Sequence, residues 1–321
     1  MTQVDAGPQT RTTKAPLRLS HWDAQNANVT EKPFIWMNGR MVSKHQANLS
    51  VFDHGVLYGD GVFEGIRVYN GKIFKLGQHM DRLWKSAKDI NLTIPITREQ
   101  MIQIQRECIE ANELSNGYIR LIVTRGVGTL GLNPNSCPVP GIICIADQIR
   151  LYPEELYEKG MRVIVAERRK IPIECLDPRI KSLNYLCNIL AKCEALNEGL
   201  LEVIMLSTEG KVTEGSGDNI FYVRKGELFT PPCDVGALEG ITRRFVKNEL
   251  CPMLGLKCSE KVFGVDELVK ADEVFMTGSA AEIIAITQID DHVISKGEGE
   301  VTARIRAKFR EIVTSDHIPE D

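Results

Sequence analysis

The most informative residue for chemistry is Lys181, which stands in the segment Pro178-Arg-Ile-Lys-Ser-Leu-Asn-Tyr185. Apolar neighbours indicate a partly buried amine, and Arg179 lies two residues away. Burial or a neighbouring cation lowers the pKa of a lysine and makes its amine a better nucleophile. A lysine taken by itself is ordinarily a solvated surface group, so this interpretation needs support from other segments.

Three further segments suit a flat, charged ligand. In Thr213-Glu-Gly-Ser-Gly-Asp-Asn-Ile-Phe221, small residues around Glu214 allow the backbone to approach a ligand closely. In Leu238-Glu-Gly-Ile-Thr-Arg-Arg244, Thr242 lies at the start of a predicted helix, whose N–H groups suit a phosphate. Phe275-Met-Thr-Gly-Ser-Ala-Ala-Glu282 predicts a turn that could form a second phosphate clamp. Each segment alone also fits a plain turn or helix cap, so only their joint occurrence in this order is specific.

One motif points to a different class of protein. Gly126-Val-Gly-Thr-Leu-Gly131 matches the dinucleotide-binding pattern GxGxxG and follows a predicted strand, and Asp147 stands at a suitable distance. That pattern binds a pyrophosphate only when a helix begins directly after it. Pro134 and Pro138 prevent such a helix, so we expect a glycine-rich loop near a site instead.

Composition narrows the class of protein further. The 321 residues are 43% hydrophobic with a net charge of −4, which describes a globular protein without a nucleic-acid groove or a polybasic membrane patch. Nine scattered cysteines without a Cys-x-x-Cys pair argue against a zinc or redox motif. The first residues lack the apolar stretch of a signal peptide, so we expect a cytoplasmic protein with free thiols. His54 and His79 have no second ligand at metal-binding spacing and are expected to be structural, so no metal is predicted.

The hydrophobic pattern predicts an N-terminal extension, residues 1–32, and two α/β domains, residues 33–150 and 151–321. In the first domain we expect two Asn-Gly hairpins, two helices and two strands, namely Phe34–Val42, Ile66–Phe74, Leu76–Ile90, Thr97–Leu114, Tyr118–Thr124 and Gly141–Ala146. A connector over residues 148–158 leads to the second domain. There we expect strands and helices at Met161–Glu167, Tyr185–Glu198, Val203–Ser207, Gly240–Ile241 onward, Glu273–Thr277 and Val301–Ile312.

These segments resemble the class IV (fold type IV) aminotransferases that depend on pyridoxal 5′-phosphate (PLP), from about Phe34 to the C-terminus. The resemblance is strongest to the branched-chain amino acid aminotransferase group. It rests on Val51–Arg67 (VFDHGVLYGDGVFEGIR), Tyr118-Ile-Arg120, Lys181-Ser-Leu-Asn-Tyr185, Glu214–Asn219 and Gly240-Ile-Thr-Arg243. It implies a mixed α/β fold of two domains with PLP between them.

The resemblance also implies roles for particular residues. Lys181 would form the Schiff base with PLP, Tyr185 would hydrogen bond the phenolic oxygen, and Glu214 would face the pyridine nitrogen. Leu238 would pack on the ring. The phosphate would be held by Arg67, Ile241, Thr242, Gly278 and Ser279.

Substrate selection follows from the same resemblance. Tyr118, with the Ser279 and Ala280 amides, would hold the α-carboxylate of the substrate, and Arg120 would meet the side-chain carboxylate of glutamate. Tyr58 and Phe63 would wall an apolar pocket. The residues alone leave plainer interpretations open: Arg120 could pair with a surface acid, and the two aromatics could belong to the core.

The expected activity is therefore transamination of L-leucine, L-isoleucine and L-valine with 2-oxoglutarate. A D-amino acid or amine transaminase, or an aminodeoxychorismate lyase, is the alternative within this fold. Tyr185 differs from the residue that the lyases and the D-amino acid enzymes have at this position, and the Arg-x-His element of the D-amino acid enzymes is missing after Tyr118. A nucleotide-binding dehydrogenase or a non-catalytic binding module is the alternative from another class. We also expect a homodimer or larger homo-oligomer, in which residues 126–132 of one subunit close the pocket of the other.

Overall fold

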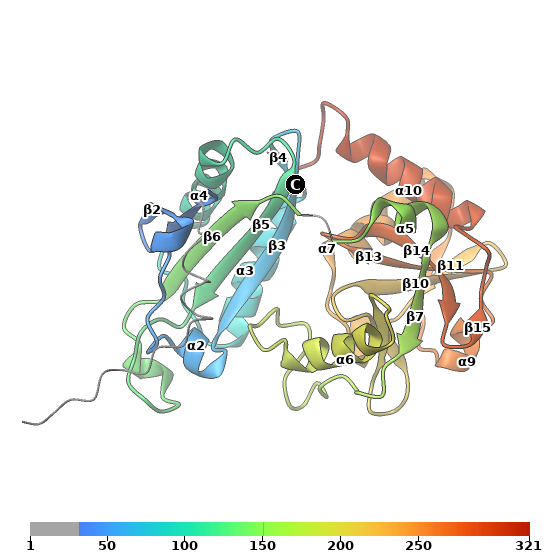
Figure 1. The fold of residues 1–321 in the computed structure, drawn as a ribbon, viewed down its shortest axis with the longest axis horizontal. Helices are drawn as coiled ribbons and strands as arrows, with labels where there is room; N and C mark the ends of the chain where they lie inside the picture. The colour runs from blue at the N-terminus through green and yellow to red at the C-terminus, as the bar shows by residue number, and fades with distance from the viewer. Residues whose placement is uncertain (1–31, 150) are drawn as a thin grey trace, which may run out of the picture.

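The computed structural model describes residues 32–149 and 151–321, so the predicted N-terminal extension lies outside the described residues except for Lys32. The described residues form two β-sheets that lie side by side, each with its own helices (Figure 1). The first sheet is built from residues 34–147 and the second from residues 161–293. A domain boundary near residue 150 remains a prediction.

The first sheet has six antiparallel strands in the order β2-β1-β6-β5-β3-β4. The strands are β1 (Phe34–Met37), β2 (Arg40–Ser43), β3 (Gly61–Tyr69), β4 (Lys72–Ile73), β5 (Gly117–Thr124) and β6 (Gly141–Asp147). The helices of this half are α2 (His54–Tyr58), α3 (Leu76–Asp89) and α4 (Arg98–Ala111), with 3-10 turns η1 (Lys44–Gln46) and η2 (Pro134–Ser136). Helices α3 and α4 cover one face of the sheet and bury Met80, Leu83 and Met101 against Ile119 and Leu121.

Local sequence signals explain several of these elements. Asn38 and Gly39, and likewise Asn70 and Gly71, adopt positive φ angles, as the tight turn of an Asn-Gly hairpin requires. Thr97 and Gln100 form the predicted capping box at the start of α4, with Thr97 Oγ1 accepting from Gln100 N at 3.2 Å and Gln100 Oε1 accepting from Thr97 N at 2.8 Å.

The second sheet has nine strands in the order β12-β11-β10-β13-β14-β7-β8-β9, and β15 pairs with β14. Its strands are β7 (Met161–Val165), β8 (Val203–Leu206), β9 (Val212–Glu214), β10 (Asn219–Arg224), β11 (Glu227–Thr230), β12 (Cys258–Glu260), β13 (Glu273–Gly278), β14 (Glu282–Ile289) and β15 (His292–Val293). Its helices are α5 (Glu154–Lys159), α6 (Leu186–Asn197), the 3-10 turn η3 (Cys233–Val235), α7 (Ile241–Phe245), the π-helical turn η4 (Val246–Leu250), α8 (Cys251–Met253), α9 (Val265–Leu268) and α10 (Glu300–Val313). The core between α10 and this sheet contains Phe221, Phe275, Ile305 and Phe309.

The segment around Lys181 joins the two halves, because it follows β7 in the sequence but hydrogen bonds to the first sheet. Phe63 N donates to Lys181 O at 3.0 Å, and Leu183 N donates to Gly61 O at 2.9 Å. Lys181 N in turn donates to Ser86 Oγ of α3 at 3.1 Å. The backbone of Lys181 is therefore fixed to β3 and α3 while its side chain lies between the sheets.

The structure corrects two expectations about elements. The connector over residues 148–158 contains helix α5, which begins directly after Pro153. Strand β14 follows the Ser279 turn immediately, where only a turn was expected. The helix predicted to begin at Gly240–Ile241 is confirmed: α7 begins at Ile241, and after five residues the chain continues as the π-helical turn η4. As expected, no α-helix follows the Gly126–Gly131 motif before β6, only the 3-10 turn η2.

Two global features complete the description. All nine cysteines lie among the described residues and are unpaired. Within the described part of the chain, no helix is long and apolar enough to cross a bilayer.

Candidate active site

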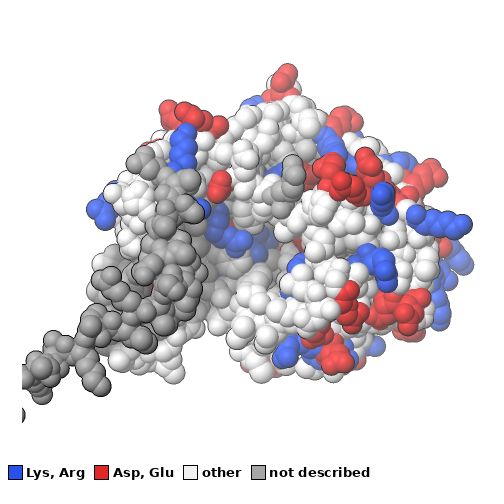
Figure 2. Space-filling model, viewed as in Figure 1, with Lys and Arg blue, Asp and Glu red and all other residues white. Residues whose placement is uncertain are grey.

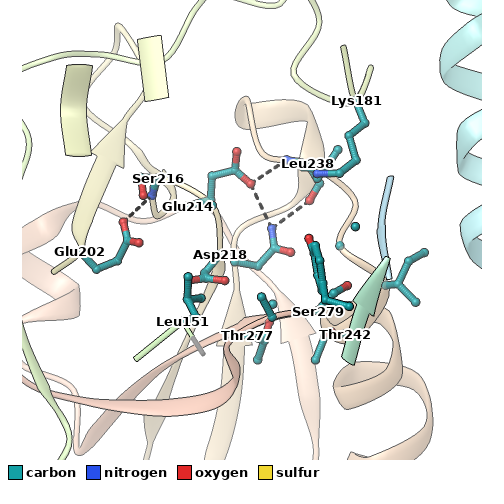
Figure 3. A pocket seen from close by; sticks show the side chains of 18 of the residues that line it. Leu151, Lys181, Glu202, Glu214, Ser216, Asp218, Leu238, Thr242, Thr277 and Ser279 are labelled. Carbon is teal, nitrogen blue, oxygen red and sulfur yellow. Dashed lines mark hydrogen bonds between the residues drawn. The ribbon is translucent and has the colours of Figure 1, made fainter. Parts of the chain in front are cut away.

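A cavity lies between the two sheets and receives side chains from both (Figure 2). Basic side chains are visible inside this hollow, and the residues that line it also include the acids Glu202, Glu214 and Asp218. From the first half it is lined by Gly65, Arg82, Tyr118 and Arg120. From the second half it is lined by residues that include Lys181, Glu214, Leu238, Ile241, Thr242, Gly278, Ser279 and Ala280 (Figure 3). The cavity thus collects residues from all four segments singled out in the sequence.

The amine of Lys181 lies at the top of this cavity. Its Nζ donates to Tyr185 Oη at 3.1 Å and lies 4.5 Å from the centre of the Phe63 ring. Burial and the nearby Arg82 guanidinium lower the pKa of Lys181 to about 7, although Glu64 opposes the shift. A substantial fraction of this amine is therefore uncharged at neutral pH, which nucleophilic attack requires. Burial, followed by the charge of Glu214, raises the pKa of Tyr185 to about 12.

Glu214 ends β9 and presents a buried carboxylate to the cavity. Its Oε1 accepts from Lys170 Nζ at 2.6 Å, and its Oε2 accepts from Leu238 N at 2.9 Å and Asn219 Nδ2 at 3.2 Å (Figure 3). Three donors, one of them cationic, favour the ionised carboxylate. Burial lowers the pKa of Lys170, but the charge of Glu214 outweighs it and leaves the pKa raised. The ion pair therefore stays charged within the protein.

The opposite end of the cavity is suited to an anion. Ile241 and Thr242 begin α7, no side chain caps that helix, and the N–H groups of a first helical turn have no partner within the helix. Thr277 Oγ1 is buried, lines the cavity and has no hydrogen-bond partner among the described residues. Gly278 ends β13, and Ser279 follows it on the adjacent turn. Unsatisfied buried donors of this kind call for a ligand with several acceptor oxygens.

Arg82 of α3 adds a cation to the cavity wall and contacts the backbone two residues before Ile241. Its Nε and Nη2 donate to both oxygens of the buried Glu64 at 2.7 and 2.8 Å, and its Nη1 donates to Glu239 O at 2.9 Å. His79 Nδ1 lies 2.7 Å from Glu64 Oε2. Burial raises the pKa of Glu64, but Arg82 and His79 outweigh it and hold the pKa well below its usual range. The network fixes the guanidinium at the cavity wall.

Tyr118 and Arg120 project into the cavity from the same face of β5. The guanidinium carbon of Arg120 lies 4.5 Å from the centre of the Phe63 ring and 5.7 Å from that of Tyr118. Gly65 makes room for Tyr118, because a Cβ at Gly65 would stand only 1.7 Å from Tyr118 Oη. Phe63 is not itself among the lining residues but supports both Lys181 and Arg120.

Four predicted site residues do not line the cavity. Phe63 and Tyr185 contact Lys181 from outside the lining, whereas Arg67 and Tyr58 lie elsewhere. Arg67 does not line the cavity; its Nη2 lies 3.6 Å from Glu282 Oε1, and its guanidinium lies over the Tyr69 ring. Tyr58 ends α2 on the surface and accepts a hydrogen bond from Gly131 N at 2.8 Å. Tyr58 therefore contacts the glycine-rich loop and not the cavity of its own chain.

Sequence reasoning missed Arg82 and Lys170. Arg82 lies on α3 three residues after His79, and only its position beside the apolar stripe of a predicted helix hinted at burial. Lys170 ends the run Arg168-Arg169-Lys170, in which nothing in the sequence separates the buried cation from the other two. His54 Nε2 lies 2.9 Å from Thr129 O, and the described residues contain no cluster of three or more metal-binding side chains.

Comparisons with known proteins agree with this geometry. Residues 61–289 match the family model described as amino-transferase class IV. A protein of Methanocaldococcus jannaschii, provisionally named a branched-chain-amino-acid aminotransferase, is 47% identical over 87% of this chain and 96% of its own length. An aminodeoxychorismate lyase of Bacillus subtilis is 33% identical over 86% of this chain and 93% of its own.

Solved structures give the same result for the fold. A branched-chain amino acid aminotransferase from T.th., solved with pyridoxamine 5′-phosphate, matches with a TM-score of 0.85 and 36% identity, covering 91% of this chain and 97% of that one. The same enzyme has been solved with N-(5′-phosphopyridoxyl)-L-glutamate and with 4-methylvaleric acid. The chain belongs to the class IV aminotransferase family, and its mixed α/β fold with two sheets is the fold of that family.

Proposed function

We propose that the chain is a PLP-dependent aminotransferase that exchanges amino groups between L-branched-chain amino acids and 2-oxoglutarate, giving branched 2-oxo acids and L-glutamate. The observation that carries the proposal is the placement of Lys181, with its lowered pKa, in one cavity with the ion-paired carboxylate of Glu214. The relatives and solved structures named for this reaction match nearly the whole chain and support it.

The donor set of the cavity fits PLP. Lys181 offers an amine for its aldehyde, and Glu214 offers a carboxylate for its ring nitrogen. The phosphate would be held by the N–H groups of Ile241 and Thr242 and the hydroxyls of Thr277 and Ser279.

Two protein groups complete the cofactor site. The cation for the phosphate is Arg82 in this proposal, since Arg67 does not line the cavity. Leu238 would pack against the ring, and its backbone also holds Glu214.

When bound, PLP supplies an electron sink for the carbanion formed at the substrate Cα. Glu214 favours a protonated ring nitrogen, because an anion raises the pKa of a neighbouring base. Lys181 accepts the proton from Cα as an uncharged amine and returns it to the cofactor carbon C4′. Tyr185, whose Oη contacts Lys181 Nζ, orients that amine.

Substrate selection is assigned to the first half of the cavity. Tyr118, with the backbone amides of Ser279 and Ala280, would hold the α-carboxylate, and Arg120 would meet the second carboxylate of glutamate or 2-oxoglutarate. Leu151 supplies an apolar group to the lining, and Phe63 packs against Arg120 without lining the cavity itself. An apolar wall beside one arginine allows a single pocket to accept both leucine and glutamate.

We also propose a homodimer in which Tyr58 and residues 126–132 cover the pocket of the partner. Apolar side chains that are exposed in the isolated chain run from α2 through this loop to α6, and contiguous patches of this kind mark protein interfaces. Gly128 N donates to Phe52 O, and Asn184 Nδ2 donates to Gly59 O, so these segments are joined. The exposed side chains are Val51, Phe52, Val56, Leu130, Leu132, Leu186 and Ile189.

The proposed location is the cytoplasm, supported by the nine unpaired cysteines, because a reducing compartment keeps thiols free.

A substrate panel tests the proposed reaction. PLP-loaded protein is assayed for amino transfer from L-leucine, L-valine and D-alanine to 2-oxoglutarate, and for pyruvate release from aminodeoxychorismate. We expect turnover with the two L-amino acids. Turnover confined to D-alanine or to aminodeoxychorismate would assign the chain to the alternative activities; the lyase assay is included because one relative carries that name.

A further inference from the structure

A buried cluster of acids lies at the edge of the same cavity and has no role in the reaction described above. Tyr152 Oη lies 3.1 Å from both Glu202 Oε2 and Asp218 Oδ2. All three side chains are at most 5% exposed. Tyr152 belongs to the connector between the two sheets and lines the cavity together with Ile149 and Leu151. Figure 3 shows Leu151 at this wall.

The hydrogen bonds around Glu202 identify it as the ionised member of the cluster. Its Oε2 accepts from Lys192 Nζ at 2.8 Å, and its Oε1 accepts from Ser216 N at 2.8 Å and Val203 N at 2.9 Å. Asp218, by contrast, has no cation within ion-pair distance among the described residues. Gly278 admits the Asp218 carboxyl to its place, since a Cβ there would lie 1.9 Å from Asp218 Oδ1.

A phenol has one proton and can donate to only one carboxylate at a time. If both acids were ionised, one of them would face a lone pair of Tyr152 at 3.1 Å. Every contact is satisfied when Asp218 carries a proton, donates it to Tyr152 Oη, and Tyr152 donates to Glu202. Burial and the charge of Glu202 raise the pKa of Asp218 to about 7, which agrees with that assignment.

We propose that Tyr152 is a positioning residue for substrate binding, which holds the connector wall of the pocket in place through a protonated Asp218 and an ionised Glu202. We call the trio of Tyr152, Asp218 and Glu202 the connector latch. The proposal rests on the proposed function, because the pocket that Leu151 lines is the one assigned to the substrate.

Because Asp218 must carry a proton in the connector latch, the latch depends on pH in a defined direction. Among the described residues, the charged and titratable groups that face Asp218 are Tyr152, Glu202, Lys192, Glu214 and, from α5, Tyr157. The hydrogen bonds of the connector latch favour the protonated Asp218. The stabilisation that the latch gives to the pocket wall is therefore complete below the ordinary pKa of an aspartate, about 4. It decreases as the pH rises and is lost once the pH has passed through about 7.

The effect of the connector latch on binding can be measured without turnover. The ligand is 4-methylvalerate, an unreactive apolar carboxylate, and it is added to the PLP-loaded protein. We expect its Kd, from calorimetry, to rise about fivefold between pH 6 and pH 8.5, as loss of one hydrogen bond would give. In Asp218→Asn the amide donates to Tyr152 without titrating, so Kd should stay at the low-pH value of the wild type. In Tyr152→Phe it should be about fivefold higher at both pH values.

Three further measurements separate positioning from general damage. The KM for L-leucine should follow Kd, while kcat changes less than about twofold, because kcat reports interactions made only in the transition state. Amide exchange in residues 148–153 should speed up in Tyr152→Phe. Asp291→Asn, which removes an exposed carboxylate, should keep the pH dependence of the wild type.

The proposal is overturned if Asp218→Asn shows the same change of Kd with pH as the wild type, or if Tyr152→Phe binds as tightly as the wild type. Either result would leave the proposed function intact, since leucine turnover itself tests that function.

Discussion

Lys181 and Asp218 line the same cavity and reach a pKa of about 7 from opposite directions. For both groups burial is the largest cause, because a poorly solvated site disfavours the charged form. A neighbour of like charge adds to burial in each case: Arg82 lies near Lys181, and Glu202 lies near Asp218. The cavity therefore holds two proton-exchanging groups near neutrality, one basic and one acidic.

Two other buried groups show what prevents burial from moving a pKa toward neutrality. Glu64 is fully buried, yet Arg82 and His79 keep its pKa low. Lys170 is buried, yet Glu214 keeps its pKa high. Groups with an opposite charge at hydrogen-bond distance stay ionised, and groups facing a like charge become titratable. The first kind fixes geometry in this site, and the second kind changes its charge near neutral pH.

The largest expected effect follows removal of the basic titrating group. In Lys181→Ala, transamination of L-leucine should fall by at least about a thousandfold, since proton transfer by the amine is lost together with the covalent link. Steady-state kinetics with 2-oxoglutarate measures the loss. Lys211→Ala, which removes an exposed lysine of the same half, should retain normal turnover. Comparable activity in both variants would contradict the assignment.

Breaking the fixed ion pair should have the next largest effect. In Lys170→Met, Glu214 keeps two neutral donors but loses the cation that its Oε1 contacts. We expect kcat/KM for L-leucine to fall about a hundredfold, in line with the cost of leaving a buried charge unpaired. Lys170→Arg should recover most of the activity. If Met and Arg behaved alike, the charge of residue 170 would have no part in the reaction.

A substitution at Arg120 tests whether this cation acts on one class of substrate only. In Arg120→Ala we expect kcat/KM for L-glutamate to fall about thirtyfold, as for loss of a charge-assisted hydrogen bond, and that for L-leucine to change less than about threefold. Half-reactions with each amino acid, followed by cofactor absorbance, provide the values. Equal losses with both substrates would show that Arg120 does not select the side-chain carboxylate.

The smallest effect concerns pH. With a pKa of about 7, the uncharged fraction of Lys181 rises about tenfold between pH 6 and pH 8 and then levels off. The rate at which the PLP-free protein captures PLP, followed by absorbance, should show the same increase. N-acetyl-lysine amide, whose amine has an ordinary pKa, should keep accelerating up to about pH 10. A protein rate that rises in parallel with the peptide amine would place the Lys181 pKa near its normal value.

Local signals allowed much of the fold to be predicted. The Asn-Gly turns at Asn38 and Asn70 and the capping box of Thr97 and Gln100 act within a few residues and appear where expected. Helix α5 was missed because six residues between Pro153 and Gly160 give too short a periodic pattern.

The candidate site also contains residues that local sequence signals predicted and residues that they did not. The segments that carry Lys181, Glu214, Thr242 and Ser279 converge on one cavity, as expected from their joint occurrence. The placements of Arg82 and Arg67 depend on which acid each guanidinium meets, Glu64 or Glu282, and on packing between elements far apart in the sequence. No local pattern contains that information.

The decisive measurement is to locate the lysine that carries PLP. The loaded protein is reduced with borohydride and digested, and the pyridoxyl-labelled peptide is identified by mass spectrometry. We predict a single label on Lys181, between Ile180 and Ser182. A label on Lys170, Lys192 or any other lysine, with Lys181 unmodified, would contradict the proposed chemistry.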